Sequence, residues 1–268
     1  MSVIHPSALI EPGARLADDV HVGPFCWVRS GAVIGSGCRL VSHVSVHSGV
    51  TVGPRCVMHA GVVLGDEPQD LGFKSGTGSF VEIGEGTVLR EGVTVHVGTK
   101  EGTVTRIGRQ CYLMANSHVA HNCTLADHVI LANGALLGGY VEVGERCFIS
   151  GNAMVHQFVR IGRLAMLGGG TGASKDVPPF CITRGVSLNQ VTGLNTTGLR
   201  RAGFDAEARL AVKRAFKAVY FSNQGTREAA RAVLDADPTP AQREFAEFIL
   251  ASKRGVSAGP DILVDDAD

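Results

Sequence analysis

Aliphatic and small residues recur along the chain with a period of six. Cut from Ile10, the sequence reads IEPGAR, LADDVH, VGPFCW, VRSGAV, IGSGCR, LVSHVS, VHSGVT, VGPRCV and MHAGVV. The first position of these hexads is Ile, Leu, Val or Met, and the fifth is Ala, Val or Cys. The phase is lost after Leu64, returns at Ile83, and runs from Ile107 to Pro178. A period of six fits neither an α-helix nor a simple alternating strand.

This pattern predicts short strands joined by turns, each pointing one large and one small residue inward. Three hexads close a triangular coil, so residues 18 apart in the sequence stack on one another at about 4.8 Å. Gly or Asn in the turns can adopt a positive φ. We therefore expect an all-β parallel β-helix over residues 1–182, followed by a C-terminal α-helical domain over residues 183–268.

Two segments interrupt the coil, 66–80 (DEPQDLGFKSGTGSF) and 99–106 (TKEGTVTR). The first breaks the phase, whereas the second breaks the motif and keeps the count of six. Loops that project from a rigid scaffold often carry function, and a tolerated surface insertion is the alternative. We favour a functional role for the 66–80 segment.

The region after Pro179 reads as helical. A helix capped by Asp205 is expected to bury an apolar face made of Leu210, Phe216, Val219 and Tyr220. Thr226 is expected to cap a second helix. Thr239 and Pro240 open a third with the spacing of a capping box, and Gly255 supplies its stop.

Composition narrows the class of protein. The chain has 268 residues, 44% hydrophobic residues and zero formal net charge, which gives no basic excess for nucleic acid or an anionic membrane. The N-terminus lacks the pattern of a signal peptide, and no apolar run reaches membrane-spanning length. The seven Cys are expected to be reduced core residues, and without a CxxC pair we expect no structural zinc site. These features favour a cytoplasmic protein.

Several motifs carry a resemblance to a known family. The segments MANSHVAHNCTLADHVILANGALLGGYVEVG, AMVHQFVRIG, KDVPPF, EPQDL and GLRRAGF resemble the UDP-N-acetylglucosamine O-acyltransferases, through Phe221. The resemblance implies a left-handed coil and a homotrimer with active sites between subunits. It also implies transfer of a 3-hydroxyacyl group from acyl carrier protein to the 3-position of a UDP-sugar, the first step of lipid A synthesis. The thioester is a co-substrate, and no metal or diffusible cofactor is implied.

The candidate catalytic residues share one column. His121 is the third residue of the hexad VAHNCT, on a turn, where a side chain points away from the core, and it matches the family's catalytic base. Gly139 follows 18 residues later and Gln157 follows 36 later, so the three residues should stack. The backbone N–H of Gly139 would suit a developing oxyanion, a role the resemblance also implies. An ordinary turn glycine is the alternative reading.

We expect substrate contacts from a wider group, although Asp70 could instead orient the base. Its members are Asp70, Lys74, His118, Asn122, Tyr140, His156, Gln157, Gly169, Asn195, Arg200 and Arg201. Gly169 matches the position that limits acyl-chain length, and an open slot there would admit a longer chain. An Arg pair suits a diphosphate, although a solvated helix face explains it as well. His118 could equally be a stacked surface histidine.

The sequence departs from the family pattern at defined places. Gly72 stands where the family has Lys, Asn122 where it has Asp, Tyr140 where it has His, and Thr197 where it has Glu. The 185–195 segment is one residue longer. These changes concern sugar, donor and nucleotide contacts. A different acceptor, such as an amino-sugar nucleotide, therefore remains an alternative.

Three other functions share this scaffold. An acetyl-CoA-dependent acetyltransferase is disfavoured by the HQF motif and the helical C-terminal region. A zinc hydratase similar to the γ-class carbonic anhydrases would use His96, His118 and His121 as ligands. A non-catalytic paralogue that keeps only binding is the third alternative.

Overall fold

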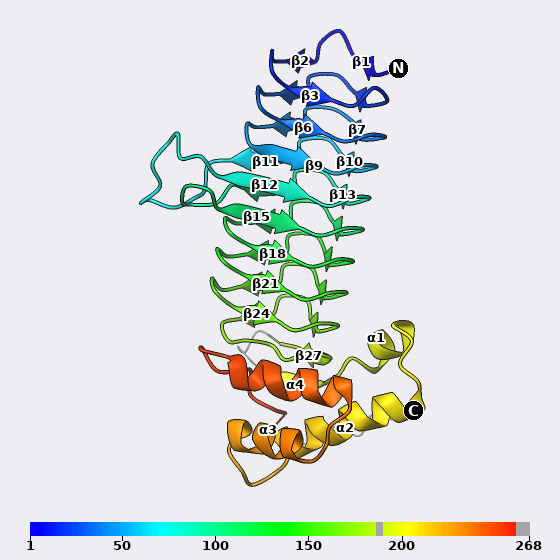
Figure 1. The fold of residues 1–268 in the computed structure, drawn as a ribbon, viewed down its shortest axis with the longest axis vertical. Coiled ribbons are helices and arrows are strands. Elements are labelled where there is room, and N and C mark those ends of the chain that lie inside the picture. The colour runs from blue at the N-terminus through cyan, green and yellow to red at the C-terminus, as the bar shows by residue number, and fades with distance from the viewer. Residues whose placement is uncertain (186–189, 261–268) are drawn as a thin grey trace.

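The computed structural model describes residues 1–185 and 190–260, and the chain folds as a left-handed parallel β-helix followed by helices (Figure 1). Each coil visits three sheets in turn, here called A, B and C. Sheet A contains β1 (Val3–Ile4), β4 (His21–Val22), β7 (Arg39–Leu40), β10 (Val57–Met58), β13 (Val88–Leu89), β16 (Tyr112–Leu113), β19 (Ile130–Leu131), β22 (Phe148–Ile149), β25 (Met166–Leu167), β27 (Cys181–Thr183) and β28 (Val191–Leu194).

Sheets B and C complete the triangular section. Sheet B contains β2 (Leu9–Ile10), β5 (Trp27–Val28), β8 (Ser45–Val46), β11 (Val63–Asp66), β14 (Thr94–His96), β17 (His118–Val119), β20 (Leu136–Leu137), β23 (Met154–Val155) and β26 (Gly172–Ala173). Sheet C contains β3 (Arg15–Leu16), β6 (Val33–Ile34), β9 (Val50–Val52), β12 (Phe80–Ile83), β15 (Val104–Ile107), β18 (Thr124–Leu125), β21 (Glu142–Val143) and β24 (Arg160–Ile161).

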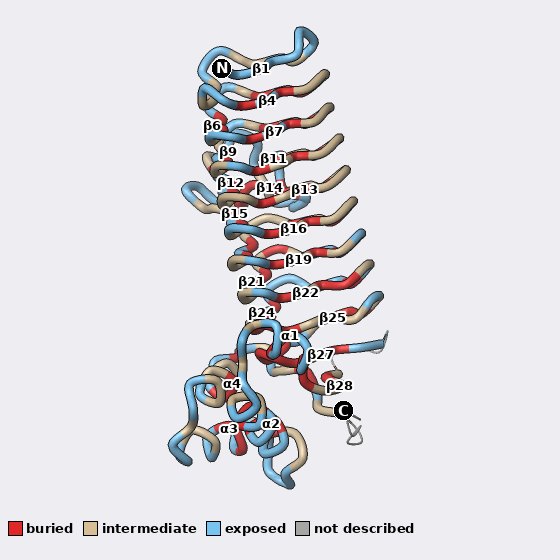
Figure 2. Tube along the Cα trace, turned by 90° about the vertical axis from the view of Figure 1, so that its right-hand side faces the viewer, coloured by how far each residue is buried: buried red, intermediate tan, exposed pale blue. Residues whose placement is uncertain are grey.

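The hexad explains the packing of each coil. Most strands have two residues, the sixth of one hexad pointing out and the first of the next pointing in, as Val33 and Ile34 do. The small fifth residue, such as Cys38, fills the corner and is fully buried. Buried segments accordingly repeat down the coil in Figure 2. All seven Cys are free and buried, which confirms them as core residues.

The turns show a regularity that composition did not reveal. The fourth position of most hexads has a left-handed φ whether it is Gly, Asn or a large residue, for example 68° at Gly37, 61° at Asn122 and 61° at Tyr140. Such a φ is uncommon for large side chains. Repetition of one turn geometry therefore overrides the preference of individual residues.

Both insertions leave the coil at the same corner, between sheets B and C. The first separates β11 from β12, and the second separates β14 from β15. Sheet pairing absorbs them, because Val52 pairs with Ile83 and Ile83 pairs with Ile107. The insertions also contact each other, since the Gly78 N–H donates to the Glu101 carboxylate at 2.9 Å. Figure 1 shows the first insertion projecting from the coil.

The sheet continues past the expected boundary at residue 182. β27 pairs in parallel with β25, and β28 pairs antiparallel with β27, so helices begin only at α1 (Thr196–Arg201). The others are α2 (Ala206–Tyr220), α3 (Thr226–Asp235) and α4 (Pro240–Ala251). Residues 186–189 of the long segment and 261–268 of the tail lie outside the described residues.

The helical region confirms two caps and corrects three details. Asp205 caps α2, and Thr239 caps α4 with a complete capping box. Thr226 is not a cap, because α3 begins there and its N-cap is Gly225 without a side-chain bond. Leu210 is 47% exposed and lies off the buried face of α2. Gly255 has a positive φ but follows the end of α4 by four residues, so it is not the stop.

No helix among the described residues is both long and apolar enough to cross a bilayer.

Candidate active site

His121 lies in the turn between β17 and β18, on the corner that carries both insertions. Its half-buried ring covers Gly139 of the next coil. A Cβ built on Gly139 would lie 2.3 Å from Cε1 and 2.5 Å from Nε2 of His121, so only glycine leaves room for the imidazole. The Tyr140 N–H donates to the His121 carbonyl at 3.0 Å, and the Phe158 N–H donates to the Gly139 carbonyl at 2.9 Å. These bonds confirm the predicted stacking, with Gln157 beside Phe158.

Gly139 offers a backbone donor beside the histidine. The residue is buried, and its N–H has no backbone acceptor among residues 1–185 and 190–260. The donor is therefore available to an oxygen atom that approaches the His121 ring.

The other ring nitrogen of His121 is occupied. Nδ1 lies 3.0 Å from Oδ1 of Asn122. The same oxygen accepts from the backbone N–H of Thr99 at 3.0 Å and lies 3.1 Å from the Thr99 hydroxyl. Thr99 belongs to the second insertion, which the sequence did not single out as functional. Nδ1 is thus engaged by Asn122, whereas Nε2 has no hydrogen-bond partner among the described residues.

Two further histidines lie next to His121 on sheet B. The rings of His96 and His118 meet edge-on with centroids 4.7 Å apart, and Nδ1 of His118 lies 2.7 Å from the Thr94 hydroxyl. Burial, then His96 and His121, lowers the pKa of His118 to about 4. Burial also lowers the pKa of His96, whose buried Nδ1 has no partner among the described residues. His118 is therefore a neutral hydrogen-bonding group near pH 7.

The zinc alternative requires three ligands in one place. Within the part of the chain that the structure describes, no three His, Cys, Asp or Glu side chains are grouped to hold a metal ion. His96 and His118 meet through their rings, and His118 directs Nδ1 to a threonine hydroxyl. This arrangement suits hydrogen bonding to a substrate better than chelation.

The lowered pKa of His118 predicts acid-sensitive stability. Unfolding returns the imidazole to an ordinary pKa near 6.5, so the unfolded chain binds more protons between about pH 6.5 and 4. The free energy of unfolding should then decrease as the pH is lowered across this window, by up to about 3 kcal/mol from this group. Denaturant titrations at about pH 7 and pH 4.5 should show a weaker dependence in His118→Gln. The exposed-residue control His21→Gln should keep the wild-type dependence, and an equal slope in both variants would contradict the assignment.

The first insertion holds Asp70 and Lys74 on an exposed loop. The Asp70 carboxylate accepts from the Gly72 N–H at 2.8 Å, which stabilises the turn at Leu71. No contact joins Asp70 or Lys74 to His121 within the described part of one chain. Their substrate contacts stay predictions.

His156 and Gln157 are held by a residue that sequence reasoning missed. Arg254 follows α4 and donates to the Gln157 carbonyl at 2.6 Å and to the Ser174 carbonyl at 3.0 Å. Its guanidinium also lies 3.2 Å from Nδ1 of His156. The chain after α4 therefore fixes the HQF segment below Gly139. An isolated Arg near the C-terminus gave no signal of this role.

The expected nucleotide residues gather on the opposite side of the coil. A pocket of about 560 Å³ lies between α1 and the outer face of sheet A. It includes Asn195, Thr197 and Arg201, whereas Arg200 is not among its lining residues. The sequence missed its other basic residues, His128, Arg146 and Arg184. Three guanidinium groups suit a diphosphate.

Asn195 has an internal role in addition. Its side chain accepts from the Gly198 N–H at 2.9 Å as the cap of α1, and it donates to the Leu164 carbonyl at 2.8 Å. The residue is buried. One of its two N–H donors and one of the two lone pairs on its oxygen are therefore used within the protein.

Gly169 lies apart from His121. It occupies a turn between β25 and β26, at the corner of sheets A and B, and is exposed. A Cβ there would meet nothing closer than the Gly151 carbonyl oxygen at 3.6 Å. Space for a larger side chain is therefore present.

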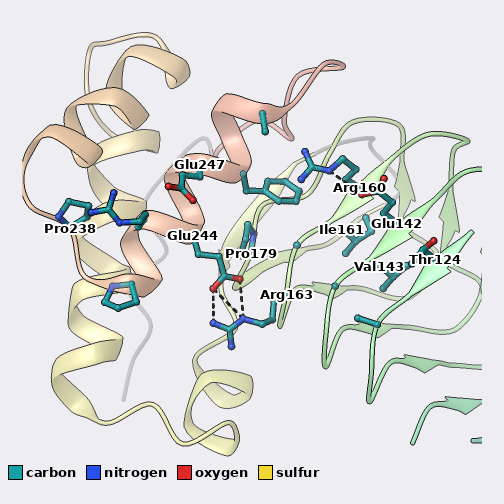
Figure 3. A pocket seen from close by; sticks show the side chains of 17 residues that line it. Thr124, Glu142, Val143, Arg160, Ile161, Arg163, Pro179, Pro238, Glu244 and Glu247 are labelled. Carbon is teal, nitrogen blue, oxygen red and sulfur yellow. Dashed lines mark hydrogen bonds and ion pairs between the residues drawn. The ribbon is translucent and has the colours of Figure 1, made fainter. Parts of the chain in front are cut away.

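A larger pocket does not contain these residues. It measures about 1040 Å³ and lies between sheet C and α4 (Figure 3). Its charged groups neutralise one another: Arg163 donates to Glu244 at 2.7 Å, and Arg160 lies 3.4 Å from Glu142 and over the ring of Phe248. These contacts join the coil to the helical region. We centre the candidate site on the B–C corner, where the His121 ring covers Gly139.

Comparisons with known proteins agree with this fold. Residues 105–139 match the bacterial transferase hexapeptide repeats, and residues 176–257 match domain 2 of the UDP N-acetylglucosamine O-acyltransferases. An acyl-[acyl-carrier-protein]–UDP-N-acetylglucosamine O-acyltransferase of Thiobacillus denitrificans is 38% identical over 96% of this chain and 99% of its own. One from Campylobacter concisus is 34% identical over 96% of this chain and 97% of its own.

Solved structures give the same result. A UDP-N-acetylglucosamine acyltransferase from Francisella novicida superposes with a TM-score of 0.93 at 32% identity, covering 97% of this chain and 95% of its own. The enzyme from Campylobacter jejuni gives 0.90 at 35%, covering 95% and 99%. The fold and these relatives define a hexapeptide-repeat acyltransferase. The chain belongs to the UDP-N-acetylglucosamine O-acyltransferase family.

Proposed function

We propose that this acyltransferase moves a 3-hydroxyacyl group from acyl carrier protein to the 3-hydroxyl of UDP-N-acetylglucosamine, the first step of lipid A synthesis. The carrying observation is the His121 ring seated over Gly139, with Nδ1 held by Asn122 and an unused N–H beside Nε2. The full-length relatives named for this reaction support the substrates. A cytoplasmic location follows from this carrier-protein donor.

The residues divide one acyl transfer between them. The sugar hydroxyl attacks the thioester carbonyl carbon, and its proton passes to Nε2 of His121. The carbonyl oxygen becomes an oxyanion that accepts from the Gly139 N–H. The carbon–sulfur bond then breaks, and the departing thiolate takes the proton back from the His121 imidazolium. The products are the ester and the free thiol, and no metal or diffusible cofactor enters.

The separation of the parts supports a site shared between subunits, and the family resemblance implies that the assembly is a homotrimer. The pocket containing Arg201 lies on the outer face of sheet A, whereas His121 lies at the B–C corner on the other side of the coil. One UDP-sugar must reach a diphosphate site and the base together. A second copy of the chain can supply one of them, and sedimentation velocity measures the assembly. A stable monomer at working concentration would exclude a site shared between subunits.

A thioester-consumption assay tests the reaction. Acyl carrier protein and coenzyme A thioesters are offered with UDP-N-acetylglucosamine, its 3-amino analogue and other UDP-sugars. Turnover requires the carrier-protein donor and UDP-N-acetylglucosamine if the proposal holds. Preference for the 3-amino analogue would revise the proposed acceptor, and preference for coenzyme A thioesters would revise the proposed donor. Metal analysis of the active protein examines the zinc alternative, and inactivity with every pair would favour a binding paralogue.

Acyl-chain length should depend on Gly169. Methionine at this position meets only ordinary contacts at the backbone, so the fold should persist. Its side chain would occupy the space proposed for distal methylenes, and a filled slot tolerates them poorly. Gly169→Met should therefore shift preference to shorter carrier-protein thioesters while short-chain turnover remains. An unchanged length profile would place the slot elsewhere.

A further inference from the structure

Asn122 is held by the second insertion at two points. Its side-chain oxygen accepts from the Thr99 N–H at 3.0 Å, and its own backbone N–H donates to the Thr105 hydroxyl at 2.8 Å. Thr105 is fully buried. Thr99 and Thr105 lie at the two ends of the insertion. This loop therefore holds Asn122, the residue directly after His121, by two hydrogen bonds.

The Thr99 contact determines which way the Asn122 amide faces. A backbone N–H can only donate, so the Asn122 atom 3.0 Å from it must be the oxygen. That oxygen can only accept, so the His121 nitrogen 3.0 Å away must carry a proton. The neutral His121 is therefore protonated at Nδ1, which leaves the lone pair on Nε2.

Tyr140 supports Thr99 from the other side. Its hydroxyl lies 2.9 Å from the Thr99 hydroxyl, and its ring stacks on Phe158 with centroids 4.9 Å apart. The same ring meets His121 edge-on at 5.3 Å. Tyr140 thus braces both the threonine and the imidazole, which gives a physical role to a residue that departs from the family pattern.

We propose that Thr99, supported by Thr105 and Tyr140, is a positioning residue that holds Asn122 so that His121 keeps its proton on Nδ1. This inference rests on the proposed base role of His121. A neutral amide selects the tautomer by direction alone, whereas a carboxylate would also attract the imidazolium by charge. The contribution of Thr99 should therefore be large with Asn122 and smaller when a carboxylate replaces it.

The test compares kcat and KM of the full-length protein. Thr99→Val keeps the size and the backbone N–H but removes the hydroxyl, which lies 3.1 Å from the same Asn122 oxygen and 2.9 Å from the Tyr140 hydroxyl. Loss of this second hold on the amide should lower kcat about five- to tenfold with KM nearly unchanged. Thr99→Ser should restore most of kcat. In an Asn122→Asp background, Thr99→Val should cost less than about twofold, because charge then holds the imidazole.

The matched control is Thr103→Val in the same insertion. The Thr103 hydroxyl bonds the Lys100 carbonyl at 2.6 Å and does not reach Asn122, so wild-type kcat is expected. An equal loss in Thr103→Val, or an equal cost of Thr99→Val in both backgrounds, would overturn the positioning role. An active wild type with unchanged Thr99→Val would overturn this inference alone. An inactive wild type would overturn the proposed function with it.

Discussion

Replacement of His121 by alanine is expected to lower kcat by about 10²–10⁴-fold, the usual contribution of a general base. The ring projects from a turn and is not part of the buried core, so little packing is lost. Circular dichroism and sedimentation should show the wild-type fold and assembly. Single-turnover acyl transfer measures the chemical step without product release. Near-normal transfer by folded His121→Ala would remove His121 from the mechanism.

Replacing Asn122 by Asp supplies the companion measurement. The Thr99 N–H and His121 Nδ1 both point at the oxygen of this side chain, so a carboxylate would accept the same bonds. Its charge favours the protonated imidazole, and the acid limb of the kcat profile should move to higher pH. No limb should move in the His121→Ala background. A shift that persists there would belong to another group.

The coil was predictable because each hexad repeats one physical constraint. The first and fifth positions must fill a narrow core, so aliphatic and small residues such as Ile34 and Cys38 recur in every hexad and give a repeated signal of the fold. The stacking of His121 on Gly139 followed from the same repeat, because the two residues are 18 positions apart, which is one coil. The helix caps at Asp205 and Thr239 were predictable because each depends only on residues within the next few positions, and both were confirmed.

Contacts between distant segments were not predictable in this way. Thr99 looked like part of an irregular insertion, and only the folded corner brings it to Asn122. Arg254 binds residues nearly a hundred positions earlier. The exposure of Leu210 depends on which face of α2 meets α4, which periodicity alone leaves open. Single polar residues give no repeated signal, so their partners appear only in three dimensions.

Gly139→Ala is expected to lower kcat about a hundredfold or more. The new methyl carbon would fall 2.3 Å from Cε1 and 3.0 Å from Nδ1 of His121, well inside van der Waals contact. The ring must then swing away from its place beside the Gly139 N–H. Misplacement of a catalytic group by about 1 Å can cost about 10²-fold. Loss of an oxyanion donor alone costs about 10²–10³-fold.

Gly151→Ala is the matched control for Gly139→Ala. A Cβ at Gly151, also in a turn of the coil, would meet only the Asn133 carbonyl oxygen at 3.4 Å, which is ordinary contact. Gly151 neighbours the proposed slot at Gly169, so turnover is compared with a short-chain thioester. With that donor, this variant should keep nearly full turnover and the wild-type melting temperature. A comparable loss in Gly151→Ala would mean that any methyl in a turn disturbs the coil.

The double variant His121→Ala/Gly139→Ala separates two roles of Gly139, room for the imidazole and donation of its N–H. If the added methyl acts by displacing the imidazole, Gly139→Ala should cost much less once His121 is already alanine, because the clash has gone. Residues in contact show such non-additive effects, whereas independent sites add. A residual loss in the His121→Ala background would measure the contribution of the Gly139 N–H as an oxyanion donor. Fully additive losses would contradict the displacement, because they would mean that Gly139 acts without reference to the His121 ring.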